Sequence, residues 1–205
     1  IKLNSMFTEQ QFSIPPLQGI SVKTIEEHLK LYSGYVKNTN SIIEKIPEYQ
    51  GYEKEDTFAP YVISELFRRF AFEWGGMRNH ECYFKLLEGA SSPAVDSKLV
   101  KAIEKQWGSL DVWKTRFQAI ALTRGIGWAM LYFDPISNQL VNAWVDEQQL
   151  GQLAGCSLVI ALDMWEHSYV ADYLPSGKKK YVDDFMNQMS WRQAEINFVN
   201  AKNKV

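Results

Sequence analysis

A short apolar run followed at once by two residues of metal-binding type is the feature that most constrains this chain. Residues 157–162 (SLVIAL) are typical of a buried β-strand. Asp163 follows directly, and His167 comes four residues later. We therefore expect the strand to end in a carboxylate with an imidazole close behind it, as in many metal sites. A structural salt bridge or a buried hydrogen bond would account for the pair equally well.

The histidine count favours the metal site. The chain has only three histidines, His28, His80 and His167. His28 and His80 lie in aromatic-rich stretches with helical periodicity, where a core histidine would need a special reason. One site that uses all three imidazoles explains them together.

Composition bounds the class of protein. With 205 residues, 46% of them hydrophobic, the chain can bury the core of one compact protein. Its 22 basic and 24 acidic residues are nearly balanced, so we expect neither nucleic acid nor a membrane surface as a partner. Cys82 and Cys156 lack the spacing of a thiolate metal site and suit a reducing compartment. We expect a cytoplasmic location; because the first residue is Ile, an exported one stays open.

The first half reads as helical. After an irregular lead-in over residues 1–18, the apolar spacing predicts a long amphipathic helix from about Ser21, with Ser21 or Thr24 as its N-cap and His28 facing inward. Tyr35 lies two turns later on nearly the same face. There it either covers the group that His28 binds or packs as an ordinary core aromatic. A second helix is predicted from about residue 59, interrupted at residues 75–76 (GG), and a third over 77–88. The glycine pair is read as a helix break, or as a point of close approach.

The second half reads as mixed. Residues 89–97 are rich in Ser, Ala and Pro, so we place a boundary there between residues 1–90 and 91–205. Three strands are predicted, the first two as an antiparallel hairpin: 128–133, 140–145 and 158–162. Four helices are predicted around them: 95–106, 110–122, 179–189 and 191–201.

Three segments now carry a resemblance to a known family. Residues 163–169 (DMWEHSY) resemble the DxWEHxY signature of the iron/manganese superoxide dismutases. Residues 78–84 (RNHECYF) are similar to that family's NHxxYF/W segment, and residues 125–129 (GIGWA) to its GxGW segment. The similarity keeps the family's order from about residue 14 to 198. It implies an α+β fold, in which an N-terminal helical hairpin precedes an α/β half with a three-stranded antiparallel sheet flanked by helices.

The resemblance also implies a ligand set. His80, Asp163 and His167 match family ligands, and His28 would be the fourth, from the first helix. With a bound water or hydroxide they would hold one Fe or Mn ion per subunit. Neutral imidazoles with one carboxylate suit such a borderline redox metal. A closed zinc site is the alternative, but a chain that can bury this much core needs no metal ion to stabilise its fold.

The first helix departs from the family pattern. Family members have a second histidine four residues after the ligand and a tyrosine at eight, whereas this chain has Tyr32 at four and Tyr35 at seven. The resemblance implies Tyr35 as the gateway tyrosine, with Tyr32 in place of the usual histidine. Because that histidine meets the signature tyrosine of the partner subunit, the role of Tyr169 is open.

A glutamine beside the bound solvent is expected in this family. Iron-type members carry it four residues before the second ligand, where this chain has Gly76. Manganese-type members carry it between the second strand and the signature, and counting from the strand favours Gln148 over Gln149. Its amide would tune the metal's potential through the bound solvent. The pattern leans towards Mn, or towards use of either metal, and Fe stays open because distances set the metal's potential.

Two further roles follow from the resemblance. Trp128, with Trp165 and Phe84, would form an apolar wall that admits only small anions, although plain core packing would use the same residues. Glu166 resembles the residue that bonds the last histidine ligand across a two-fold interface. A homodimer is therefore implied, with a tetramer as the alternative.

The implied activity is disproportionation of superoxide to dioxygen and hydrogen peroxide by a mononuclear Fe or Mn that cycles between trivalent and divalent states. Two other functions remain to be weighed. A metal-binding relative with little or no turnover fits the altered first helix. A non-haem iron oxygenase also uses two histidines and a carboxylate, but the third histidine argues against it.

Overall fold

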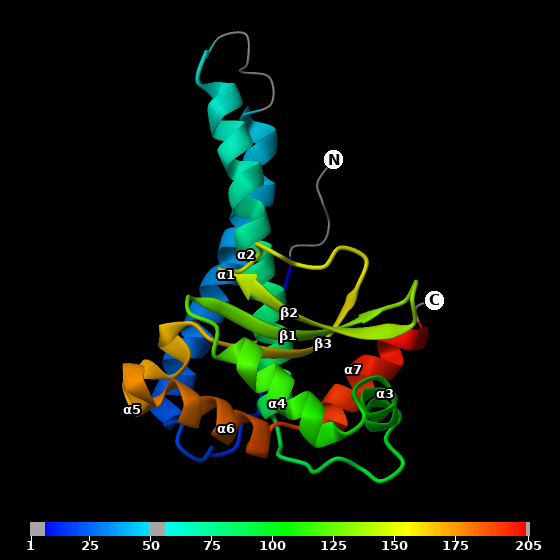
Figure 1. Ribbon diagram of the computed structural model, residues 1–205. Helices are drawn as coiled ribbons and strands as arrows, with labels where there is room; N and C mark the ends of the chain where they lie inside the picture. The colour runs from blue at the N-terminus through cyan, green and yellow to red at the C-terminus, as the bar shows by residue number, and fades with distance from the viewer. Residues whose placement is uncertain (1–6, 50–55, 204–205) are drawn as a thin grey trace.

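A long helical hairpin projects from a body built around a small sheet (Figure 1). The computed structural model describes residues 7–49 and 56–203. The arrangement confirms the predicted fold class, a helical hairpin followed by an α/β half with a three-stranded antiparallel sheet. The proposed division into residues 1–90 and 91–205 stays a prediction.

The first arm of the hairpin is α1 (Val22–Tyr49). Ser21 caps it as predicted, because its hydroxyl accepts the backbone N–H of Thr24 at 3.2 Å. His28 and Tyr32, one turn apart, are both buried on the same side of the helix. The predicted inward direction of His28 is therefore confirmed.

The second arm is one continuous helix, α2 (Ala59–Leu87). The predicted break at Gly75 and Gly76 is therefore wrong, and the other interpretation, close approach, is right. A methyl group on Gly75 would collide with the backbone carbonyl of Gln148, and one on Gly76 would collide with the ring of Tyr35. A glycine costs a helix only about 1 kcal/mol relative to alanine, so packing of this kind outweighs the loss.

The body follows the predicted order of helices and strands. Within the described ranges none of the helices is both long and apolar enough to cross a bilayer. The elements after α2 are α3 (Lys98–Trp107), α4 (Leu110–Ala121), β1 (Gly127–Asp134), β2 (Gln139–Asp146), β3 (Ser157–Asp163), the 3-10 turn η2 (Glu166–Ser168), α5 (Val170–Tyr173), the 3-10 turn η3 (Pro175–Gly177), α6 (Lys178–Gln188) and α7 (Trp191–Asn203).

The sheet places two of the predicted site residues side by side. Its strand order is β2-β1-β3, and both pairings are antiparallel. Trp128 at the start of β1 lies opposite Asp163 at the end of β3. Side chains of opposed residues project from the same face of a sheet, so the indole and the carboxylate face the same layer. Helix α2 packs against β3, which brings the hairpin to that end of the sheet.

Replacing Gly75 tests the close approach. Gly75→Ala should lower the free energy of unfolding by about 1–3 kcal/mol, because the methyl group overpacks the contact with Gln148. Gly34→Ala is the matched control, since a Cβ on Gly34 in α1 would meet no atom within 4 Å. It should raise stability by roughly 0.4–1 kcal/mol. Urea denaturation at fixed protein concentration measures both, and equal effects would contradict this view of the glycine pair.

Candidate metal centre

Four side chains from four elements meet at the centre of the molecule. His28 comes from α1, His80 from α2, Asp163 from the end of β3 and His167 from η2. One potential ligand atom from each lies within 4.8 Å of all the others. The first three residues are buried, and the side chain of His167 is 24% exposed. The structure thus brings together all four ligands predicted from the sequence.

One carboxylate oxygen is the point of convergence. Asp163 Oδ2 lies 3.1 Å from Nε2 of His28, 3.2 Å from Nε2 of His167 and 3.5 Å from Nε2 of His80. The other oxygen, Oδ1, accepts the backbone N–H of Trp165 at 2.8 Å. That bond fixes the orientation of the carboxylate, so Oδ2 is held towards the three imidazoles.

The tautomer of His80 leaves one nitrogen ready for a metal. Its Nδ1 lies 2.6 Å from the carbonyl of Gly76, which can only accept, so Nδ1 carries the proton. Nε2 then presents a lone pair, and this buried atom has no hydrogen-bond partner among the described residues. An unpaired buried nitrogen beside a carboxylate and two further imidazoles is what a metal ion would satisfy. The donor set, three nitrogens and one oxygen, fits Fe or Mn.

The protonation states suit ligation as well. Burial lowers the pKa of His80 to about 3, and burial also lowers that of His28. Burial on its own raises the pKa of Asp163, but its interactions with His167 and His28 outweigh this and hold the pKa below its usual range. At neutral pH the buried imidazoles are therefore neutral and the carboxyl group is ionised.

A hydrogen-bonded chain of three predicted residues borders the four ligands. The Trp128 indole N–H donates to Gln148 Oε1 at 2.9 Å, and Gln148 Nε2 donates to the Tyr35 hydroxyl at 3.0 Å. The Tyr35 ring lies 5.1 Å from that of His80, centroid to centroid. Gln148 is fully buried, whereas Gln149 is half-buried. The fold thus brings Gln148, rather than its neighbour, to the site.

Aromatic rings enclose the centre on its other sides. Phe84 lies 4.9 Å from the ring of His28, and Trp165 stacks on His167 at 5.8 Å. Tyr35 and Trp165 are only partly buried, so the route from solvent lies on their side of the site. Burial, together with the charge of Asp163, raises the pKa of Tyr35 well above its usual range, so its hydroxyl keeps its proton.

Tyr32 does not join the hydrogen-bond chain of Tyr35. Its buried hydroxyl accepts the backbone N–H of Gln10 at 2.9 Å and donates to Glu81 Oε1 at 3.2 Å. Burial raises its pKa to about 12. Tyr32 therefore ties the lead-in segment to the hairpin.

Glu81 was not predicted from the sequence. It pairs with Arg78 at 2.7 Å. An acid next to His80 and three residues after an arginine was a usable signal for this pair.

The two residues assigned to subunit contacts stay outside the site within one chain. Glu166 is exposed and makes no side-chain hydrogen bond to the part of the chain that the structure describes. Tyr169 is 5% exposed, and its ring stacks on that of Tyr181 at 5.3 Å. The Tyr181 hydroxyl in turn donates to the backbone carbonyl of Asp163 at 2.9 Å. Tyr169 thus packs behind the carboxylate.

Comparison with known proteins gives a consistent result. The family described as iron/manganese superoxide dismutases, C-terminal domain, matches residues 95–197. The chain is 36% identical to a superoxide dismutase [Fe] of Cupriavidus metallidurans, over 90% of this chain and 91% of that protein. It is 28% identical to a superoxide dismutase [Mn/Fe] of Aeropyrum pernix, over 97% and 95%, and 29% identical to a superoxide dismutase [Mn] of Mycobacterium leprae, over 86% and 83%.

Replacement of the shared carboxylate tests the ligand set. Asp163→Ala should abolish tight metal binding, because it removes the single anionic donor and leaves three imidazoles around a cavity. Plasma emission analysis of protein purified after growth with Fe and Mn measures the metal content. The exposed Asp96 on the surface provides the control, Asp96→Ala, which should retain the native content. A full equivalent of metal in Asp163→Ala would refute the assignment.

Proposed function

This chain belongs to the iron/manganese superoxide dismutase family, and from that premise we infer how its own residues carry out the reaction. The protein is a superoxide dismutase that converts two superoxide anions and two protons to dioxygen and hydrogen peroxide. The observation that carries the inference is the convergence of His28, His80, Asp163 and His167 within 4.8 Å. It supplies the ligand set that this chemistry requires.

The four residues would hold one Fe or Mn ion. When bound, that ion would supply the one-electron chemistry, a change between trivalent and divalent states, by which one superoxide is oxidised and the next reduced. The three imidazoles would bind it through Nε2, the nitrogen that each turns towards Asp163 Oδ2. The Asp163 carboxylate offsets part of the ion's positive charge, and its fixed orientation keeps the donor set in place.

The hydrogen-bond chain of Trp128, Gln148 and Tyr35 next to the ligands positions a group that transfers protons. The Gln148 amide is fixed at both ends, by the Trp128 indole N–H and by the Tyr35 hydroxyl. Its orientation is therefore constant during turnover, which preorganises the site for a change of charge. The Tyr35 hydroxyl retains its proton at neutral pH, and its partly exposed ring lies between the ligands and solvent. It orients the anion by hydrogen bonding and passes protons from water to the reduced product.

The apolar wall of Phe84, Trp128 and Trp165 selects the substrate by its size. Phe84 and Trp128 are fully buried beside His28 and His80, and Trp165 covers one face of His167. We expect rings packed this closely to admit a diatomic anion and to exclude larger reductants. Selectivity for superoxide therefore comes from packing as much as from charge.

A homodimer completes the site. Of the four residues, only His167 has a partly exposed side chain, and the exposed Glu166 beside it has a carboxyl group that makes no hydrogen bond to the described part of the chain. Across a two-fold axis, Glu166 of one chain reaches Nδ1 of the partner subunit's His167 and fixes its tautomer.

The free cysteines Cys82 and Cys156 suit the reducing cytoplasm, where the enzyme acts as an antioxidant.

Metal reconstitution tests the function directly. Protein stripped of metal and reloaded with either Fe or Mn should remove superoxide in a xanthine-oxidase-coupled assay, and the stripped protein should not. Urate formation serves as the control, because it shows that the superoxide source itself is unaffected. A protein that binds one equivalent of either metal without turnover would instead be the inactive relative.

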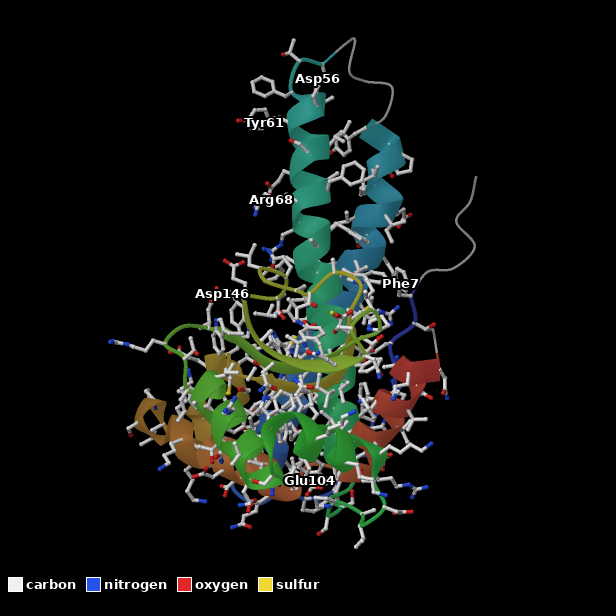
Figure 2. All side chains as sticks on the ribbon, turned by 45° about the vertical axis from the view of Figure 1, so that its right-hand side comes forward. Phe7, Asp56, Tyr61, Arg68, Glu104 and Asp146 are labelled. Carbon is white, nitrogen blue, oxygen red and sulfur yellow. The ribbon has the colours of Figure 1, made fainter. Side chains whose placement is uncertain are left out.

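Removal of the Glu166 carboxylate tests the dimer. Glu166→Ala should raise the dimer dissociation constant at least about tenfold, because the two-fold axis repeats the contact and each hydrogen bond to a charged carboxylate contributes about 1.5–3 kcal/mol. Glu104→Ala is the control, since Glu104 is exposed and lies at the end of the molecule opposite the tip of the hairpin (Figure 2). Sedimentation velocity over a range of concentrations measures the association. Identical curves for native protein and Glu166→Ala would exclude Glu166 from the interface.

A further inference from the structure

A buried acid lies beside the partly exposed tyrosine of a site that consumes an anion. Glu73 on α2 is only 3% exposed. Its Oε1 accepts Arg69 Nε at 2.9 Å, and its Oε2 accepts Asn38 Nδ2 from α1 at 3.2 Å. A buried carboxylate is costly unless it is paired, and a negative charge here would repel superoxide. Neither the ligand set nor the proton path described above uses this residue.

Its partner is a cation with one face towards solvent. The side chain of Arg69 is 46% exposed. Its guanidinium carbon lies 3.8 Å from the centroid of the Phe72 ring, within the range of a cation–π contact. The bond to Glu73 and the stacking on Phe72 together hold the positive charge in one place, whereas a free arginine side chain would sample many positions.

That place is next to the solvent side of the metal centre. The ring of Phe72 lies 6.0 Å from that of Tyr35 and 6.4 Å from that of Trp165. The Tyr35 ring in turn lies 5.1 Å from that of His80, and Trp165 stacks on His167 at 5.8 Å. The charge of Glu73 raises the pKa of Tyr35 and that of Arg69 lowers it, so both charges act on the tyrosine. An anion approaching between the two aromatic residues therefore passes through the field of the pair.

We propose that Arg69 and Glu73 set the electrostatic potential at the substrate entrance, Arg69 by attracting the anion and Glu73 by fixing Arg69 over Phe72 while weakening its attraction. The proposal rests on the proposed function only for the identity of the anion. Charged groups around a cleft govern how fast a charged substrate arrives, a behaviour for which superoxide dismutases as a class are a known example. Here the two members of one ion pair act with opposite signs on the same path.

Opposite effects of two neutralising substitutions are the test. In iron-loaded protein, Arg69→Gln should weaken the binding of azide, a small monovalent anion, by roughly three- to tenfold. It should also lower the second-order rate constant for superoxide, followed by stopped flow. Glu73→Gln should change both quantities in the other direction, because the amide still accepts from Arg69 while the negative charge is gone. Both effects should shrink as salt shortens the Debye length from about 30 Å at 0.01 M to about 8 Å at 0.15 M.

The neighbouring pair Glu65 and Arg68 provides matched controls. It lies on the same helix, bonds at 2.6 Å, and has side chains that are 57% and 68% exposed. Arg68 projects from α2 on the side away from α1 (Figure 2). Glu65→Gln and Arg68→Gln make the same changes in net charge, and they should leave azide affinity and the rate constant near the native values.

The outcomes separate this proposal from the proposed function. Azide affinity reports the approach of an anion without turnover, so it tests the pair even in a protein that fails to dismutate superoxide. Glu73→Gln with native or weaker azide binding would show that Glu73 only braces α1 against α2, and would overturn the proposal. Effects equal to those of the control pair would overturn it too. Native protein that bound no azide would refute the anion site altogether.

Discussion

The buried carboxylate of Asp163 is the group on which the centre of this protein depends. It lies wholly out of solvent, where an ionised acid is unfavourable unless polar groups surround it. The backbone N–H of Trp165 and the Nε2 atoms of His28 and His167 provide that surrounding, whereas Nε2 of His80 presents only a lone pair. The imidazoles come from α1, α2 and η2, while the carboxylate ends β3. Hairpin, sheet and signature segment must therefore all dock correctly before the donor set exists, and a metal ion bound there holds the same elements together.

The contacts that shape the environment of the metal are also contacts between the hairpin and the body. Gly75 and Gly76 remove two side chains from α2, so the carbonyl of Gln148 and the ring of Tyr35 can lie directly against that helix. The bond from Gln148 to Tyr35 then joins the loop after β2 to α1. Because the same atoms pack the fold and orient the amide, changes that loosen the hairpin will also alter the polar groups beside the metal.

Charge around the centre is arranged in compensated pairs. Two acids are buried near Tyr35, namely Asp163 and Glu73. The first faces the imidazoles and the metal position, and the second faces Arg69. Neither is left as an unpaired negative charge on the path of an anion, which would be unfavourable both for folding and for substrate approach. At the entrance and at the ligand set alike, a buried negative charge thus lies beside groups that compensate it.

The sequence alone indicated the four residues that converge at the centre, the three strands, the order of the helices and the cap at Ser21. These features depend on periodicity, on residues close together in the chain and on a motif resemblance, all of which are visible without coordinates. Tertiary structure decided the rest. Only packing shows that α2 continues through Gly75 and Gly76, because the groups that need the space belong to Tyr35 and Gln148, distant in sequence. The bonds of Tyr32 to Gln10 and Glu81, and the position of Arg69 near Tyr35, likewise result from long-range contacts that local patterns do not encode.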